Sequence, residues 1–265
     1  MNLLFVPVVV LAALLFLAGY KLGSRPVHWL AWIAALACAL PAVLMAAYYL
    51  HWYDDALWFY EFRSLPFSEL GASAAGIPAG LIQAWLVKRA PRLRVPVPGL
   101  LLVGLFVPYM KPVVAPLDVE RLAAVCKDGV CLQTTASTCG PASAASILRL
   151  FNVEETEKTL AREAFTSAGG TENWYLARAL RRRGFDVRYE IREKPVKQLP
   201  WPSVAGVTLP GGGGHFIAIL GETAEGYVVG EPMSGKLIVP KSRVRTAYDF
   251  TGFFMVVEKS EGNPR

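Results

Sequence analysis

A cysteine stands at the predicted start of a helix. The segment "LQTTASTCGPASAASILRL", residues 132–150, places Cys139 between Thr138 and a Gly-Pro pair. Pro141 suits the first turn of a helix, and the small and apolar residues after it predict that the helix continues. Because free N–H groups and the helix dipole favour an anion at this end of a helix, they would stabilise a thiolate. The sequence therefore predicts a nucleophilic cysteine.

A nucleophilic thiol also needs a proton acceptor, a group that orients the acceptor, and a donor for the oxyanion. His215 opens the predicted strand "HFIAIL" and can take the proton, whereas the other two histidines flank predicted membrane spans. Glu231, at the end of a predicted strand, can orient the imidazole. Gln133, in the approach to Cys139, can donate a side-chain N–H to an oxyanion together with the backbone N–H of the cysteine.

The order Gln, Cys, His, acid resembles the bacteriocin-processing, double-glycine-leader cysteine peptidases, a papain-like family. The resemblance covers about 130–258 and rests on "LQTTASTCGPAS", "GHFIAIL" and "VVGEPMSGK". It implies that Gln133 is the oxyanion donor, Cys139 the nucleophile and His215 the base, with the acid at Glu231 and no cofactor. The family usually has Asp at the acid position, so Glu231 departs from the pattern by one methylene group.

The arrangement of domains also departs from this family. In its best-known members the peptidase precedes a transporter membrane domain and an ATPase, whereas here it follows the apolar region, and no phosphate-binding loop motif occurs in the chain. The class of leader-peptide substrates is therefore not carried over to this chain.

The second half of the chain predicts an α+β papain-like domain, with helices first and an antiparallel sheet after them. Helical patterns cover 118–124, 140–151, 154–165 and 172–184. Strand patterns cover 185–191, 203–209, 215–222, 226–232, 236–240 and 252–258.

The first half predicts a membrane region. The chain is 54% hydrophobic and 18% charged, and the apolar excess lies before about residue 116. Four segments, near 2–20, 28–50, 67–87 and 95–114, are long enough to cross about 30 Å of hydrocarbon. We therefore expect a transmembrane anchor over 1–115 and a peptidase domain over 116–265. The small residues of the third segment suit close helix packing.

The short loops predict the orientation. Lys and Arg concentrate in the first and third loops, whereas the second loop, around "HWYDDALWFYEFRSLPFSE", is acidic and has Trp and Tyr residues that suit the membrane interface. Because basic loops stay in the cytoplasm, we expect an integral protein of a bacterial membrane with the peptidase domain on the extracytoplasmic face.

The remaining cysteines and the basic residues allow several interpretations. Cys126 and Cys131 favour a disulfide, with free thiols or a zinc site that includes Cys139 and His215 as alternatives. Cys38 lies in a predicted span and indicates packing. The formal charge of +6 is scattered, and the run 181–183 is typical of a solvated helix end, so nucleic acid is not an expected partner.

The leading hypothesis is a membrane-anchored cysteine peptidase that cleaves an extracytoplasmic peptide or protein. The same residues could instead transfer the acyl group to an amine. Two alternatives remain open: a peptide-binding module that does not cleave, or an accessory subunit whose spans dock to membrane proteins of an export or surface-maturation complex.

Overall fold

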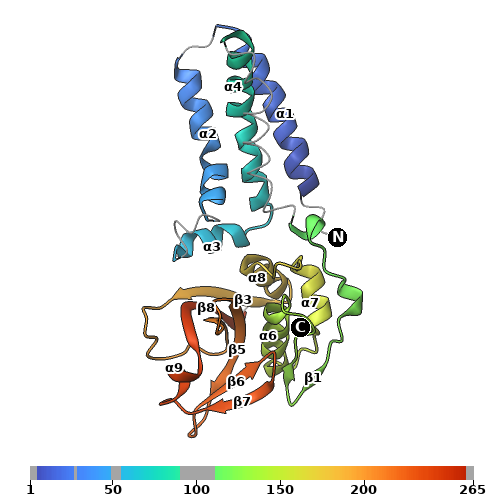
Figure 1. The fold of residues 1–265 in the computed structure, drawn as a ribbon, viewed down its shortest axis with the longest axis vertical. Helices are drawn as coiled ribbons and strands as arrows, with labels where there is room; N and C mark the ends of the chain where they lie inside the picture. Colours follow the sequence, from blue (N-terminus) through green and yellow to red (C-terminus); the bar gives the residue numbers. More distant parts are fainter. Residues whose placement is uncertain (1–4, 27–28, 49–54, 90–110, 261–265) are drawn as a thin grey trace. The chain divides into compact units, whose positions relative to one another are not determined.

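A computed structural model of the 265-residue chain describes residues 5–26, 29–48, 55–89 and 111–260. The chain forms two compact units (Figure 1). One consists of Asn2–Asp54 and Phe67–Val114, and the other combines Asp55–Pro66 with Ala115–Arg265. The second unit therefore includes a segment from the loop between the second and third predicted spans.

The first unit contains the helices α1 (Phe5–Gly23), α2 (Trp29–Tyr48) and α4 (Gly76–Arg89), with the 3-10 helix η1 (Ser68–Ala75) before α4. Three stretches, Phe5–Gly23, Trp29–Tyr48 and Ser68–Arg89, are long and apolar enough to cross a membrane. They agree with the first three predicted spans, and most of the fourth, near 95–114, lies outside the described residues.

Small residues bring α4 against α1, as the composition of the third predicted span indicated. A Cβ atom on Gly80 would lie 2.1 Å from the carbonyl oxygen of Phe16, and one on Gly76 would lie 2.3 Å from that of Ala12. At this approach only glycine fits. The two helices therefore pack backbone to backbone.

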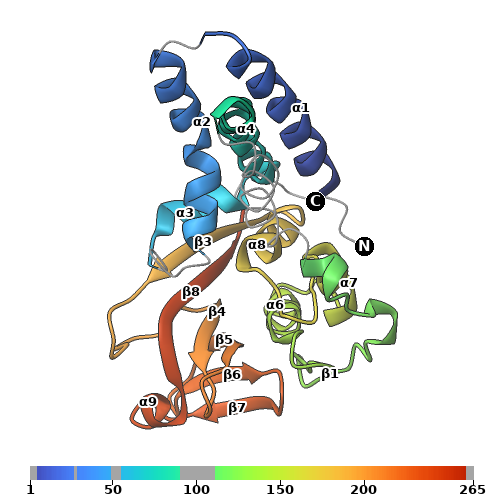
Figure 2. The same ribbon diagram turned by 45° about the horizontal axis from the view of Figure 1, so that its top comes forward.

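The second unit is built on a six-stranded antiparallel sheet, in the order β3-β8-β4-β5-β6-β7 (Figures 1 and 2). The strands are β3 (Phe185–Ile191), β4 (Ser203–Thr208), β5 (Gly214–Glu222), β6 (Tyr227–Glu231), β7 (Gly235–Val239) and β8 (Asp249–Lys259). The helices are α6 (Cys139–Leu150), α7 (Glu157–Glu163), α8 (Asn173–Arg181) and the short α9 (Val244–Ala247). This is the expected α+β architecture.

One predicted helix is wrong in extent. The pattern over 118–124 forms only the single 3-10 turn η3 (Val119–Arg121). Leu122 is already extended, and Ala124 has a φ of 53°, which an α-helix cannot accommodate.

Helix α6 is the central helix of this unit. All its residues from Cys139 to Leu148 are buried, and the Ser143 hydroxyl donates to the carbonyl oxygen of Phe216 on β5 at 3.1 Å. A Cβ atom on Gly140 would lie 3.3 Å from the Phe216 ring, so a larger residue here would require that ring to shift by a few tenths of an ångström. The first turn of α6 is thus held directly against β5.

The second unit also contains α3 (Leu57–Ser64), which comes from the loop between the second and third predicted spans. The Phe59 ring packs edge-on against Trp174 of α8, with the ring centroids 6.0 Å apart. The Tyr60 ring lies 5.4 Å from Tyr189 and 5.3 Å from Phe253. Phe59 and Tyr60 are 1% and 5% exposed, because the sheet and α8 cover them. The prediction that the Trp and Tyr residues of this loop lie at the membrane interface is therefore wrong for Tyr60.

Polar contacts hold the carboxyl end of α3. The Arg178 guanidinium donates to the carbonyl oxygens of Arg63 and Ser64, at 2.5 and 3.3 Å. A helix leaves its last carbonyl groups without intrahelical partners. Arg178 supplies hydrogen-bond donors to two of these groups and so caps the carboxyl end of α3. Arg181 adds an ion pair with Glu61 at 2.8 Å.

The arginines at the end of α8 are paired and not simply solvated. The Arg183 guanidinium donates to the carboxylates of Glu155 and Glu163, at 2.8 and 2.7 Å, and its side chain is mostly buried. Through these ion pairs, Arg183 connects the end of α8 to α7, and Arg181 connects it to α3. The sequence alone does not indicate these partners.

Cys126 and Cys131 form a disulfide, as favoured from the sequence. It joins the strands β1 (Cys126–Lys127) and β2 (Val130–Cys131). Between them Asp128 and Gly129 both have positive φ, 51° and 80°, as a tight hairpin turn requires. These two cysteines are therefore neither free thiols nor zinc ligands.

Candidate active site

Cys139 lies at the first position of α6, and the turn before it is stabilised by side-chain hydrogen bonds. The Thr138 hydroxyl donates to the carbonyl oxygen of Thr135 at 3.0 Å and accepts from the Thr135 backbone N–H at 3.1 Å. The backbone N–H groups of the first helical turn have no partner inside the helix. The sulfur therefore lies where N–H groups and the helix dipole favour a thiolate.

His215 and Glu231 form a buried pair on neighbouring strands. The His215 Nε2 atom lies 2.8 Å from the Glu231 Oε1 atom, and each residue is 5% exposed. The Cys139 thiol is close enough to the same imidazole to raise its pKa. Because Nε2 is engaged by the carboxylate, Nδ1 is the nitrogen left for the sulfur.

The surroundings of His215 favour the protonated imidazole. Burial lowers the pKa of His215, but hydrogen bonds and charge interactions with Cys139 and Glu231 outweigh it and raise the pKa to about 9. An imidazolium between a thiol and a carboxylate can hold the sulfur as a thiolate and later give up a proton.

Gln133 makes hydrogen bonds both to the segment that follows Glu231 and to the turn that precedes Cys139. Its backbone N–H donates to the carbonyl oxygen of Pro232, the residue after Glu231, at 2.9 Å. Its side-chain Nε2 donates to the carbonyl oxygen of Thr135 at 3.0 Å, which is in the turn that leads to Cys139. An amide nitrogen carries two hydrogens, so one of them remains for a further acceptor.

The sequence interpretation missed two residues. Glu157 at the start of α7 is fully buried and accepts from both the backbone N–H and the hydroxyl of Thr134, at 2.6 and 2.7 Å. Burial and, after it, the Glu231 carboxylate raise the pKa of Tyr248, which lies between α9 and β8, to about 12. An acidic residue in a first helical turn and a tyrosine before a strand are both common, so neither carries a local signal.

No group of three His, Cys, Asp or Glu side chains that could hold a metal occurs among the residues that the structure describes. The zinc alternative, with Cys126 and Cys131 taken by the disulfide, has lost two of its ligands.

The family model of the peptidase C39 family matches residues 127–262. Solved structures with a similar fold include the peptidase domain of Streptococcus ComA, a bi-functional ABC transporter involved in a quorum sensing pathway. It is 19% identical over 49% of this chain and 96% of that chain, with a TM-score of 0.42. A double glycine motif protease from an AMS/PCAT transporter, solved in complex with its leader peptide, is 20% identical. That match covers 53% of this chain and 96% of the other, with a TM-score of 0.42.

The N-terminal peptidase C39 like domain of the toxin secretion ATP-binding protein from Vibrio parahaemolyticus is 17% identical. It covers 48% of this chain and all of the other, with a TM-score of 0.35. No curated protein matches the chain. Because the family model spans half of the chain and includes the cysteine, the histidine and the acid, the chain belongs to the peptidase C39 family and is a cysteine peptidase.

Proposed function

We propose that this protein is a membrane-anchored peptidase that cleaves an extracytoplasmic peptide or protein, with Cys139, His215, Glu231 and Gln133 as its catalytic residues. The observation that carries the proposal is the position of the His215 imidazole, between the Cys139 thiol at the start of α6 and the Glu231 carboxylate at 2.8 Å.

In the acylation step His215 holds the proton of the Cys139 thiol, and the thiolate attacks the carbonyl carbon of the scissile peptide bond. The carbonyl oxygen becomes an oxyanion. When this intermediate collapses, the C–N bond breaks, the imidazolium gives its proton to the leaving amine, and a thioester remains on Cys139.

In the deacylation step His215 takes a proton from water, and the hydroxide that forms attacks the thioester. The C–S bond breaks, the carboxylic acid leaves, and the proton returns to the sulfur. If an amine took the place of water, the same residues would transfer the acyl group.

Gln133 and the backbone N–H of Cys139 would stabilise the oxyanion in both steps. Support comes from the hydrogen bond of Gln133 to Thr135, which keeps its amide beside the turn that leads to the cysteine. The hydrogen bond from the Gln133 backbone N–H to the carbonyl oxygen of Pro232 also holds Gln133 next to the segment that contains Glu231.

Support for the membrane topology comes from α3. Residues 55–66 and the peptidase domain form one compact unit, so they lie on the same side of the membrane. The stretch 68–89, which follows α3, is long enough to cross to the other side. The chain must then cross back before residue 115, as the predicted fourth span over 95–114 would do. The anchor would therefore be 1–115 without 55–66.

Support for the outward orientation comes from the loop charges and from one contact inside the anchor. The Lys88 ammonium donates to the carbonyl oxygens of Gly23 and Ser24, at 3.4 and 3.1 Å, so the basic first and third loops lie at the same end of the helices. Basic loops stay in the cytoplasm, and this rule supports an outside location for α3 and the peptidase.

The experiment that tests the catalytic assignment uses the full-length protein in detergent, with a mixture of proteome-derived peptides as substrate. Mass spectrometry would detect new peptide termini. We expect cleavage by the wild type, and none by folded Cys139→Ala, with Cys38→Ser as the matched cysteine control. Cleavage that persists in Cys139→Ala would refute the proposal, and peptides retained without cleavage by the wild type would indicate a binding module.

A further inference from the structure

The short segment that carries Gln133 is held by three different parts of the peptidase unit. The Gln133 backbone N–H donates to the carbonyl oxygen of Pro232 at 2.9 Å. The N–H of Thr134 donates to the Glu157 carboxylate of α7 at 2.6 Å, and the N–H of Thr135 donates to a threonine hydroxyl in the turn before α6 at 3.1 Å. Of these three acceptors, the carboxylate is the charged one, and hydrogen bonds to charged groups are the stronger kind.

Both carboxylate oxygens of Glu157 bind the same residue. Oε1 accepts from the Thr134 backbone N–H at 2.6 Å, and Oε2 accepts from the Thr134 hydroxyl at 2.7 Å. That hydroxyl accepts in turn from the Ala123 backbone N–H at 2.9 Å. Glu157 is 0% exposed, and a buried carboxylate is costly unless donors such as these bind it. Thr134 is therefore fixed through both its backbone and its side chain.

The helix that contains Glu157 has a separate capping residue. The Thr156 hydroxyl accepts from the Thr159 backbone N–H at 3.1 Å, as an N-cap residue does. The Glu157 carboxylate instead binds a residue 23 positions earlier in the chain. Its hydrogen bonds therefore act outside α7, on the segment that leads to the active-site cysteine.

The side chain of Gln133 depends on this backbone for its position. Among the described residues, its Nε2 atom donates only to the carbonyl oxygen of Thr135, at 3.0 Å, and its buried Oε1 atom has no hydrogen-bond partner. An oxyanion donor must lie about 2.7–3.1 Å from the oxyanion, so a small shift of the backbone over 133–135 would remove its effect.

We infer that Glu157 is a positioning residue of the active site, whose carboxylate holds Thr134 and thereby keeps the Gln133 amide where the oxyanion forms. This inference rests on the proposed function, because it assigns Gln133 the oxyanion role. Glu157 does not contact the substrate or the Cys139 thiol in this scheme. It acts through the backbone of the residue next to Gln133.

The test uses an ester whose reaction with Cys139 forms an oxyanion and needs no particular peptide sequence. The thiolate attacks the carbonyl carbon of p-nitrophenyl acetate, the C–O bond breaks, p-nitrophenolate leaves, and an acetyl thioester remains on the sulfur. Alkylation by iodoacetamide also consumes the thiolate but forms no oxyanion. Both rates are measured in the full-length protein in detergent, with Cys38→Ser to remove the other free thiol. The ratio of acylation to alkylation therefore measures the stabilisation of the oxyanion.

The substitution Glu157→Ala removes both acceptors of Thr134. We expect acylation to slow about 10-fold, which is less than the about 100- to 1,000-fold loss on removal of an oxyanion donor itself. Alkylation should stay within about twofold of the wild type, because the thiolate keeps its surroundings. Glu157→Gln keeps one oxygen for the Thr134 N–H and should restore most of the acylation rate.

A double-variant cycle tests whether Glu157 acts through Gln133. In a Gln133→Ala background, Glu157→Ala should slow acylation no further, because the amide that it positions is already gone.

The matched control on α7 is Glu163→Ala. The Glu163 carboxylate forms ion pairs with Arg182 and Arg183, at 3.1 and 2.7 Å, so this variant disturbs the same helix and leaves the contacts of Thr134 in place. We expect a lower thermal stability than in the wild type, with an unchanged ratio of acylation to alkylation. Thermal unfolding establishes that each variant is folded.

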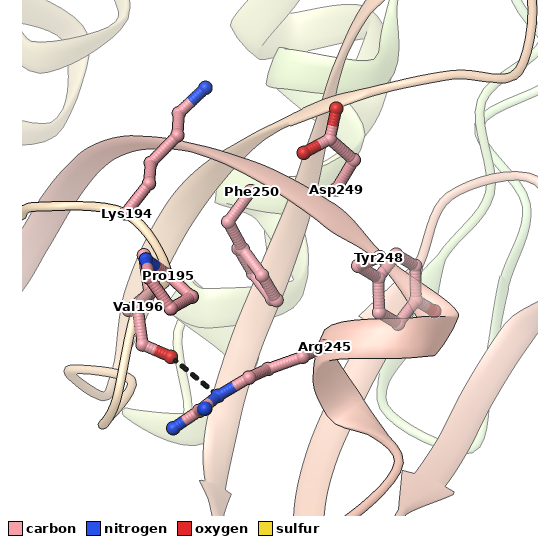
Figure 3. A pocket seen from close by; sticks show the side chains of 7 residues that line it. All are labelled: Lys194, Pro195, Val196, Arg245, Tyr248, Asp249 and Phe250. Atoms are coloured by element: carbon pink, nitrogen blue, oxygen red, sulfur yellow. Dashed lines mark hydrogen bonds between the residues drawn. The ribbon is translucent and has the colours of Figure 1, made fainter.

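A second control releases a different loop from its side-chain hydrogen bond. The Arg245 guanidinium donates to the carbonyl oxygen of Val196 at 3.2 Å, and both residues line a pocket of about 270 Å³ (Figure 3). Arg245→Ala removes this hydrogen bond. We expect it to keep the wild-type ratio, since the loop that it releases does not carry Gln133.

A wild-type ratio in folded Glu157→Ala would overturn the inference, and so would an equal fall of both rates or a further slowing of acylation in the Gln133→Ala background. If Glu157→Ala did not fold, Thr134→Val would take its place, because it removes the hydroxyl bond at an exposed residue. We expect that variant to lower the ratio, and an unchanged ratio would overturn the inference.

Failure of the proposed function has a different signature. If Gln133→Ala left acylation unchanged, the oxyanion role of Gln133 itself would be wrong. If Gln133→Ala slowed acylation and folded Glu157→Ala did not, the proposed function would stand and only the positioning role of Glu157 would fall.

Discussion

At the scale of single residues, the protonation of His215 sets the working pH of the site. Its pKa is raised to about 9 from an ordinary value of 6.5, because hydrogen bonds to Cys139 and Glu231 outweigh burial. The folded state thus binds this proton more tightly than the unfolded chain. The resulting stabilisation is complete below about pH 6.5 and is lost as the pH rises through about 9.

We therefore predict that peptide cleavage falls as the pH rises through about 9, because a neutral imidazole cannot protonate the leaving amine. The measurement is kcat/KM against pH for any peptide that the wild type cleaves.

We also predict that iodoacetamide alkylates Cys139 more slowly in folded His215→Ala than in the wild type at neutral pH. Enhanced reactivity that survives this substitution would exclude His215 as the partner of the thiol.

Glu231 has one methylene more than the Asp usual in the family, yet its carboxylate lies 2.8 Å from the imidazole. We predict that Glu231→Gln lowers kcat by about 10- to 100-fold, because a hydrogen bond to a charged group contributes about 1.5–3 kcal/mol. Glu222→Gln, at the end of β5 opposite His215, removes an ion pair with Lys241 and should keep wild-type kcat. Equal kcat values for the two variants would assign the orienting role to another group.

At the scale of elements, α3 is part of the peptidase unit although the sequence places it between two membrane spans. Phe59 is 1% exposed and packs against Trp174, whereas the neighbouring Trp58 is 53% exposed. Truncation of a buried phenylalanine costs about 3–5 kcal/mol. The stability of the peptidase unit should therefore depend on this short helix.

We predict that Phe59→Ala lowers the free energy of unfolding of the peptidase unit by about 3 kcal/mol. Trp58→Ala should change it by less than about 0.5 kcal/mol, as is usual for exposed side chains. The measurement is denaturant unfolding of the full-length protein, followed by the near-UV circular dichroism of the buried aromatic residues. Equal stabilities of the two variants would mean that α3 adds nothing to the unit.

At the scale of the whole molecule, the docking of α3 onto the peptidase requires both to be on one side of the membrane. We predict that an impermeant maleimide labels intact cells expressing Asp55→Cys or Glu225→Cys, in a background without Cys38 and Cys139. Arg25→Cys, in the first basic loop, should react only after permeabilisation. Labelling of Asp55→Cys with protection of Glu225→Cys would contradict the shared unit.

Much of this protein could be predicted from local sequence. The apolar spans, the strands, and the placement of Cys139 before Gly140 and Pro141 depend on neighbours along the chain, because length, periodicity and helix-start chemistry are local properties. The candidate residues Gln133, Cys139, His215 and Glu231 follow from their chemical types and their order along the chain, which also resembles a family motif. The disulfide was favoured because Cys126 and Cys131 are only five positions apart.

Other features depended on the tertiary structure, because they join residues that are far apart in the sequence. Tyr60 packs against Tyr189, and Glu157 accepts a hydrogen bond from Thr134, only once the sheet and helices have assembled. None of these residues has an unusual local pattern. What determines their role is burial, since a buried aromatic or carboxylate must find a partner, and only the path of the folded chain decides which one.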